Sequence, residues 1–217
     1  MTRALLDIVQ LSLFVSGFAL LISAAIGVPV GAWVGLHAFR GRRSVLALLY
    51  TGMGLPPVVV GLVVYLLLSR EGPLGGWGWL FTPQAMVLAQ TVIAFPVVAA
   101  LTASAVQAGD PDLRLQLRSL GATPAQELCL LLREARPGII AALAAGFGSI
   151  ISEVGAVMLV GGNVAGQTRV LTTAIVLETR RGNFSVALGL GAVLLGITLI
   201  VSALLLRLQD QPVRSVS

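Results

Sequence analysis

Long apolar runs separated by short polar segments make up most of the chain. Stretches without a charged residue extend over residues 8–36, 44–69, 72–109, 137–152 and 182–206. A helix needs about 20 apolar residues to cross a hydrocarbon core about 30 Å thick. We therefore predict an all-α integral membrane protein, a single transmembrane domain over residues 1–217 with five helices at about 8–36, 45–68, 85–106, 138–160 and 185–206. The first run is longer than the apolar part of a signal peptide, so we expect no cleaved leader.

A polar insert, residues 110–137, lies between the third and fourth predicted spans. Asp110 is suited to cap a short helix that starts at Pro111, and Gly121 is placed to end that helix. This pattern predicts the first half of a helical pair hinged at a glycine.

The second half of the insert starts with a capping-box pattern. Thr123 precedes Pro124 at the first helical position and Gln126 at the third, so side chain and backbone can satisfy each other's donors. A helical pair at the membrane surface is a docking surface for another protein. An ordinary amphipathic connector between two spans is the alternative interpretation.

The arginines predict the orientation of the chain in the membrane, because cytoplasmic segments carry an excess of basic residues. Most of the 14 basic residues fall on the cytoplasmic side if the N-terminus is external and the C-terminus internal. Those arginines are Arg40, Arg42, Arg43, Arg114, Arg118, Arg133, Arg136, Arg207 and Arg214. The net charge of +5 therefore reflects membrane topology, and we expect no nucleic-acid partner.

Composition argues against several kinds of chemistry. All 14 basic residues are arginines, and a P-loop ATPase needs a lysine at the terminal phosphates. His37 and Cys129 are the only residues of their types, too few for a zinc site of three or four ligands or for an internal disulfide. We expect no catalytic residue, metal or cofactor.

Glycine and proline interrupt the predicted spans. The second span begins with Gly52, Gly54, Pro56, Pro57 and Gly61. Proline frees backbone carbonyls that neighbours or a hydrated cavity must satisfy, and small residues permit close helix packing. A translocation path that includes Pro56 and Pro57 and plain helix packing are both consistent with this pattern.

The segment 161–181 is too interrupted by charge to be another span. We predict a short external helix opened by Thr168, after a flexible turn at Gly161, Gly162 and Asn163. Helix N-termini and glycine-rich turns present N–H groups to anions, and Arg169 adds positive charge. Thr172 lies in the first turn of this helix. Ordinary turn chemistry is the alternative explanation.

Glu153 is the ionisable residue predicted inside a span, about 22 Å along the fourth helix from Gly138. An intramembrane carboxylate must find a partner or water and is a candidate for function. A structural role is the alternative, in which Glu153 would bind Arg169, Ser152 or freed backbone N–H groups.

The insert resembles the cytoplasmic coupling loop of permeases of binding-protein-dependent ABC importers, through Arg118–Pro124 and Glu134–Ile139. It departs from that family at Leu115–Leu117, where an acidic residue and two alanines are typical, and around Arg133 and Glu134, where a leucine and a proline are typical. The resemblance implies docking on an ABC ATPase subunit. The residues it assigns to that docking are Arg118, Gly121, Ala122, Thr123, Pro124 and Glu127.

Residues 54–61, 69–75 and 152–163 extend the resemblance to tungstate permeases, with molybdate permeases close behind. It implies a type I importer fold in the cytoplasmic membrane of a bacterium or archaeon. It also implies a homodimer in the lipid bilayer and an extracytoplasmic oxyanion-binding protein. The translocation path would include Pro56, Pro57, Glu153, Gly161, Gly162, Asn163, Thr168, Arg169 and Thr172.

A self-sufficient secondary transporter is the competing hypothesis, and a membrane enzyme is a distant third. Secondary transporters usually show internal repeats and several intramembrane ionisable groups, which this chain lacks. Tungstate and molybdate are both tetrahedral dianions, and the sequence leaves the choice between them open.

Overall fold

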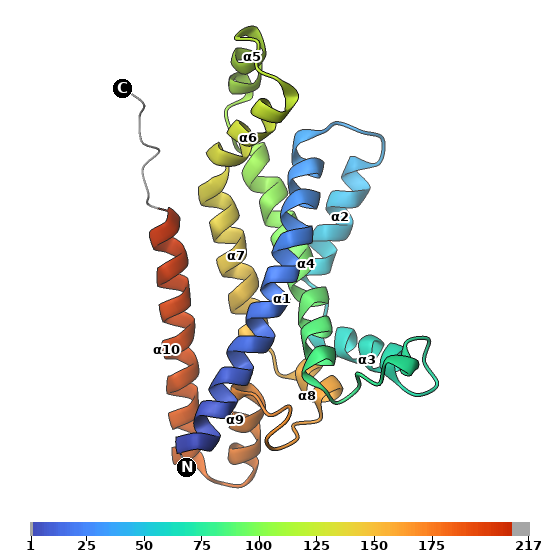
Figure 1. The fold of residues 1–217 in the computed structure, drawn as a ribbon, viewed down its shortest axis with the longest axis vertical. Coiled ribbons are helices and arrows are strands. Elements are labelled where there is room, and N and C mark those ends of the chain that lie inside the picture. The colour runs from blue at the N-terminus through green and yellow to red at the C-terminus, as the bar shows by residue number, and fades with distance from the viewer. Residues whose placement is uncertain (1, 210–217) are drawn as a thin grey trace.

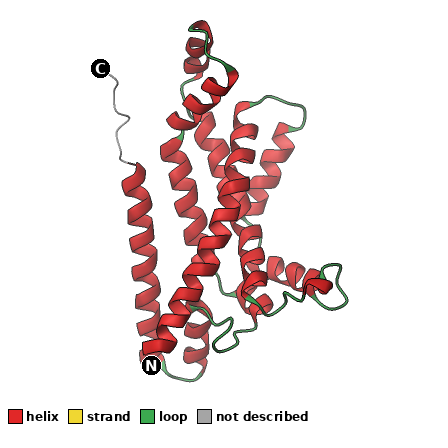
Figure 2. Ribbon diagram, in the orientation of Figure 1, coloured by secondary structure: helices red, strands yellow, loops and turns green. Residues whose placement is uncertain are grey.

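The computed structural model describes residues 2–209, and its regular structure there is entirely helical (Figures 1 and 2). Arg214, which the predicted orientation counts, lies outside this range. The elements are α1 (Thr2–Leu36), α2 (Arg42–Met53), α3 (Pro57–Leu68), the 3₁₀ helix η1 (Gly75–Trp77), α4 (Pro83–Gln107), α5 (Pro111–Ser119), α6 (Pro124–Glu134), α7 (Arg136–Ile151), α8 (Gly155–Gly161), α9 (Leu171–Arg180) and α10 (Phe184–Gln209). An all-α membrane fold is therefore confirmed.

Three of these helices, α1, α4 and α10, are long and apolar enough to cross a membrane unaided. The bent pairs α2–α3 and α7–α8 raise the number to five if each pair forms one span. The prediction of five apolar segments is thus broadly consistent with the structure. The interruption that glycine and proline predict in the second segment is present as the break between α2 and α3. The fourth segment, expected as one helix over residues 138–160, is instead broken between α7 and α8.

The second predicted span turns by 98° between α2 and α3. Pro56 adopts an extended conformation before Pro57, the first residue of α3. A proline has no N–H for a helical hydrogen bond, and it restricts the preceding residue away from the helical region. Two consecutive prolines therefore end one helix and start another in a new direction.

A seam of glycines joins α1 to α4. A methyl group built on Gly31 would lie 2.3 Å from the carbonyl oxygen of Ala99, and one on Gly35 would lie 2.9 Å from that of Ala103. A methyl group on Gly27 would lie 3.1 Å from a side-chain methyl of Val98. Close backbone approach through small residues is a principal means of helix association in lipid. The two longest central helices therefore pack along much of their length.

A second close approach joins α3 to α8. A methyl group on Gly61 would lie 2.5 Å from Cα of Ala156, and one on Gly155 would lie 2.5 Å from a methyl of Val58. The start of α3 therefore lies against the start of α8, so the two interruptions of the spans meet. Figure 1 shows α3 and α8 at the end of the bundle that also holds α9 and the N-terminus.

The outer face of α10 is apolar and exposed. Leu188, Leu195 and Leu199 each expose more than 70% of their surface. Side chains of this kind on a long apolar helix suit contact with lipid chains or another membrane helix.

Candidate functional site

The insert folds as the predicted helical pair, α5 and α6, and projects at the end of the bundle opposite α9 (Figure 1). The Asp110 carboxylate accepts a hydrogen bond of 2.9 Å from the N–H of Asp112. Gly121 has a φ of +79°, in the left-handed region that favours glycine. The N–H groups of Gly121 and Ala122 donate to the carbonyls of Arg118 and Leu117, which completes a Schellman motif.

The capping box that opens α6 is also confirmed. The Thr123 hydroxyl accepts from the N–H of Gln126 at 3.4 Å, and the Gln126 side chain accepts from the N–H of Thr123 at 2.8 Å. The caps at Asp110 and Thr123 are both local, since each involves residues at most three apart. This locality explains why they were visible in the sequence.

Glu127 lies between the two helices of the insert, with only 8% of its side chain exposed. Its carboxylate binds the guanidinium groups of Arg114 and Arg118, the latter at 3.0 Å. Hydrogen bonds from Arg118 and Arg114 hold the pKa of the Glu127 carboxyl below its usual range. In the isolated chain, Glu127 therefore ties α6 to α5 and does not face outward as a free docking group.

The exposed part of the insert combines apolar side chains with charges of both signs, among them Asp112, Arg118 and Glu134. Leu120 is 83% exposed at the hinge and Leu115 is 68% exposed on α5. The Arg118 side chain is 60% exposed although it holds Glu127. Exposed leucines around a rigid, capped hinge form a surface suited to a protein partner.

Glu153 lies at the break between α7 and α8, so its predicted position inside a continuous fourth helix is wrong. Its carboxylate accepts a hydrogen bond of 2.9 Å from the N–H of Ala156 at the start of α8. The N–H of Glu153 bonds the carbonyl of Ile150 in a tight turn. A side chain that binds nearby backbone competes with helical hydrogen bonds, which accounts for a break here.

Gln90, which the sequence analysis missed, supports this break from α4. Its side-chain amide is 4% exposed and donates a hydrogen bond of 2.9 Å to the carbonyl of Ile150, at the end of α7. Gln90 is the only amide side chain in the predicted span 85–106, and this was the available signal.

The turn after α8 is confirmed, but the predicted role of Thr168 is wrong. Gly162 and Asn163 have φ values of +71° and +53°. Thr168 is fully buried, and its hydroxyl donates to the carbonyl of Gly161 at 2.5 Å and accepts from the N–H of Val164 at 2.9 Å. It therefore closes the loop onto itself and does not open α9.

The helix α9 begins at Leu171, three residues after Thr168. The hydroxyl of Thr173 accepts from the N–H of Val170, and that of Ser12 on α1 accepts from the N–H of Leu171 at 2.9 Å. The hydroxyl of Thr172 donates to the carbonyl of Glu153 at 2.9 Å. These groups at the start of α9 are thus engaged within the protein.

Arg169 is bound to Asn163, through hydrogen bonds of 3.2 Å to the side-chain oxygen and 3.4 Å to the carbonyl. The ion pair with Glu153 that the sequence left open is absent from the described part of the chain. The structure thus gathers Gly161, the last residue of α8, with Gly162, Asn163, Thr168 and Arg169 of the loop that follows. The Thr172 hydroxyl binds the carbonyl of Glu153. Pro57 is the first residue of α3, and the start of that helix packs on α8.

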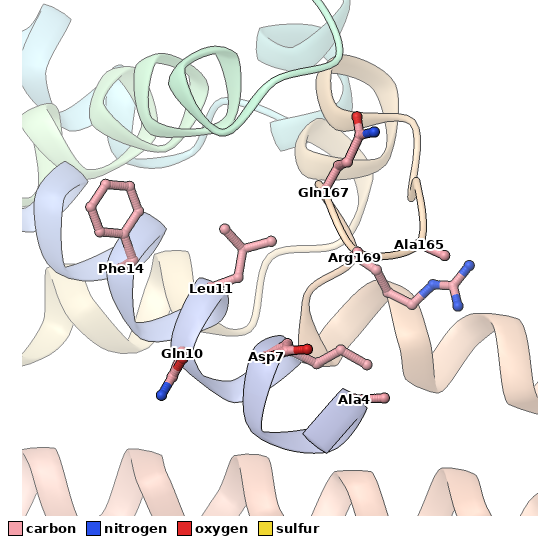
Figure 3. A pocket seen from close by; sticks show the side chains of 10 residues that line it. Ala4, Asp7, Gln10, Leu11, Phe14, Ala165, Gln167 and Arg169 are labelled. Atoms are coloured by element: carbon pink, nitrogen blue, oxygen red, sulfur yellow. The ribbon is translucent and has the colours of Figure 1, made fainter. Parts of the chain in front are cut away.

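A cavity of about 450 Å³ with a mixed polar and apolar lining lies between this loop and the first turns of α1. Figure 3 shows Asp7 and Gln10 on α1, and Gln167 and Arg169 on the facing loop. Sequence reasoning missed Asp7 and Gln10, although their spacing of three places both on one helical face. Asp7 and Arg169 are the acidic and the basic residue of the lining, so the two formal charges of the lining balance.

Within residues 2–209, no group of three His, Cys, Asp or Glu side chains is arranged to hold a metal ion. The polar groups that the described site offers are therefore backbone N–H and C=O groups, amides, hydroxyls, carboxylates and guanidinium groups.

Residues 27–216 match the family described as the binding-protein-dependent transport system inner membrane component. A probable anion ABC transporter permease protein of Haloferax volcanii is 48% identical over 95% of this chain and 91% of its own length. The tungstate uptake system permease protein TupB of Peptoclostridium acidaminophilum is 41% identical over 94% of this chain and 90% of its own.

The fold also has solved counterparts. An inward-facing structure of the MetNI methionine ABC transporter aligns with 100% of this chain and 98% of its own, with a TM-score of 0.74 and 21% identity. This likeness shows the type I importer permease fold.

Proposed function

The chain belongs to the family of binding-protein-dependent transport system inner membrane components, and on that premise we propose that it is the permease of an ATP-driven tungstate importer. Similarity to a tungstate uptake permease over 94% of the chain carries the proposal. Molybdate is the alternative substrate, since it is a tetrahedral dianion of nearly the same size.

A transported anion must be bound weakly enough to leave, so a cage of free arginines would hinder it. Arg169 shares its cavity with Asp7 and already binds Asn163, which moderates its attraction for a dianion. Thr168 and Thr172 commit their hydroxyl protons to backbone carbonyls, so we assign them the role of shaping the path. We assign the same role of shaping the path to the residues at the two helix breaks, which are Pro56 and Pro57 at one break and Glu153 at the other.

The energy source in this proposal is a separate ABC ATPase that docks on α5–α6. The rigid hinge at Gly121, with exposed Leu115 and Leu120 beside it, supports this assignment. A second copy of the chain completes the path, because five membrane segments are few to enclose it, and oligomers of this kind are usually two-fold symmetric. An extracytoplasmic binding protein delivers the anion.

Reconstitution of the permease with its ATPase and binding protein in liposomes tests the proposal. We expect tungstate to accumulate inside the liposomes only when ATP is present on the side of the membrane that holds the ATPase. Elemental mass spectrometry measures the accumulated tungsten. A complex whose ATPase is inactivated is the matched control. Uptake that follows an ion gradient without ATP would instead identify a secondary transporter.

Equimolar tungstate and molybdate, supplied together, decide between the two substrates. A ratio of accumulated metal that favours tungstate supports the proposed substrate, and a ratio that favours molybdate replaces it. Repeating the measurement with a range of binding-protein concentrations separates delivery by that protein from selection by the permease.

A further inference from the structure

The C-terminal end of α1 is held by side chains from two other parts of the chain. The last four carbonyls of a helix have no partner within it. In α1 the first of them, that of Trp33, accepts from the N–H of His37. Arg42 donates to the carbonyls of Val34 at 2.9 Å and Gly35 at 3.1 Å.

The fourth carbonyl, that of Leu36, accepts a hydrogen bond of 2.8 Å from Arg114 on α5. The same guanidinium binds the buried Glu127 carboxylate on α6. One side chain thus joins α1 to both helices of the insert. Its positive charge also lies at the negative end of the α1 dipole, which favours this arrangement.

Arg118 provides an instructive contrast. It binds Glu127 from the same helix as Arg114, but its side-chain hydrogen bonds stay within the insert. The side-chain hydrogen bonds of Arg42, in contrast, go to carbonyls of α1 and not to the insert. Arg114 combines the two contacts. Removing it would leave the Glu127 carboxylate with one partner fewer and would release the insert from α1.

From this attachment α1 continues as one helix to the opposite end of the bundle (Figure 1). The glycine seam holds it to α4 on the way. Near its far end, the hydroxyl of Ser12 accepts the N–H of Leu171 at the start of α9, directly after the 162–170 loop. A displacement of the insert therefore has a continuous packed route to that loop through α1.

We propose that Arg114 is a positioning residue that transmits movement of the ATPase-docking insert to α1 and so to the loop at the other end. The proposal rests on the proposed function, in which the insert docks the ATPase. Arg114 lies outside the residues that the family resemblance assigns to docking.

Spin-label distance measurements test the attachment directly. Cys129 is the only cysteine, so Cys129→Ser provides a background for labels at Gln116→Cys on α5 and Leu21→Cys on α1. We expect a narrow distance distribution in the intact complex and a markedly broader one in Arg114→Gln. The matched control, Arg42→Gln, removes a cap from the same end of α1 and should keep the distribution narrow.

Transport per ATP hydrolysed provides the functional readout in the same preparations. We expect Arg114→Gln to retain the ATPase on co-purification but to lower anion import per ATP at least about fivefold, the factor that about 1 kcal/mol produces. In Arg42→Gln, anion import per ATP should stay within about twofold of that of the unsubstituted complex, a smaller change than about 1 kcal/mol would produce. Arg114→Lys, which retains a charge beside Glu127 but lacks the fork, should fall between them.

Three results would overturn the proposal: a narrow distribution in Arg114→Gln, an equal loss of coupling in Arg42→Gln, or release of the ATPase by Arg114→Gln. If Arg114→Gln does not reach the membrane, Arg114→Lys is judged by the same readouts. Failure of the unsubstituted complex to import either oxyanion would count against the proposed substrate. The distance measurements would still decide the role of Arg114 in that case.

Discussion

The hydroxyl of Thr172 donates a hydrogen bond of 2.9 Å to the carbonyl oxygen of Glu153. This bond joins the first turn of α9 to the break between α7 and α8. It links residues 19 positions apart, and both groups lie in a partly buried region. The break is therefore held from outside its own segment as well as by local turns.

Thr172→Val keeps the shape of the side chain and removes this hydrogen bond. We expect the free energy of unfolding to fall by about 1 kcal/mol, the usual net contribution of such a bond. Thr172→Ser retains the hydroxyl and is the control. The thermal unfolding midpoint in detergent is the measurement, and equal midpoints for the two variants would contradict the assigned role.

Glu153 acts as a cap in this structure, because its carboxylate accepts the N–H of Ala156. Glu153→Ala should lower stability by about 1 kcal/mol, the typical cost of losing a helix cap, whereas Glu153→Gln retains an accepting oxygen and should lose less. Thermal unfolding of the two variants in parallel measures the difference. A larger loss in Glu153→Gln would show that the charge itself is needed.

The absence of an ion pair between Glu153 and Arg169 in the described chain yields a separate expectation. The effects of Glu153→Gln and Arg169→Gln on stability should add within about 0.5 kcal/mol in a double-mutant cycle. Rescue of Arg169→Gln by the second substitution would restore the pairing hypothesis.

The glycine seam of α1 offers a matched pair of substitutions. Gly31→Ala would place a methyl group 2.3 Å from the carbonyl oxygen of Ala99, so we expect a loss of about 1–3 kcal/mol from overpacking. Gly17 lies on the same helix with nothing within 4 Å of a built methyl. Gly17→Ala should therefore be neutral or slightly stabilising by thermal unfolding. Equal effects at both positions would show that the seam is not tightly packed.

Gly121 tests the insert through backbone conformation alone, since a methyl group there would meet no atom within 4 Å. Its φ of +79° strains a residue with a side chain by about 1–2 kcal/mol. Gly121→Val should weaken binding of the ATPase about tenfold, whereas Gly121→Asn, which tolerates the left-handed region, should weaken it less. Titration of the reconstituted permease with the ATPase measures both. Unchanged affinity in Gly121→Val would show that docking does not depend on this hinge.

The local chemistry of the insert was fully predictable. The Asp110 cap, the Gly121 hinge and the Thr123 capping box each depend on residues a few positions apart, and all three are confirmed. The orientation of Glu127 was not predictable, because its partners Arg114 and Arg118 lie on a different helix. The sequence does not show how α5 packs against α6, and so it does not show that these two arginines face Glu127.

Segments governed by distant contacts were harder to predict. Thr168 has the usual character of a helix cap, yet its burial against Gly161 uses the hydroxyl to close the loop. The prolines at residues 56 and 57 indicated an interruption but not a turn of 98°, which depends on how α3 packs on α8.

Amino-acid order is sufficient to establish the membrane class, the apolar segments and the capped insert, because hydropathy and capping act within a few turns of helix. Tertiary packing decides where the spans bend and which polar groups stay free. A hydroxyl or carboxylate binds whichever donor or acceptor the fold brings near. Thr172 meets the Glu153 carbonyl, and Arg114 meets Leu36 across 78 positions, only after the helices have packed.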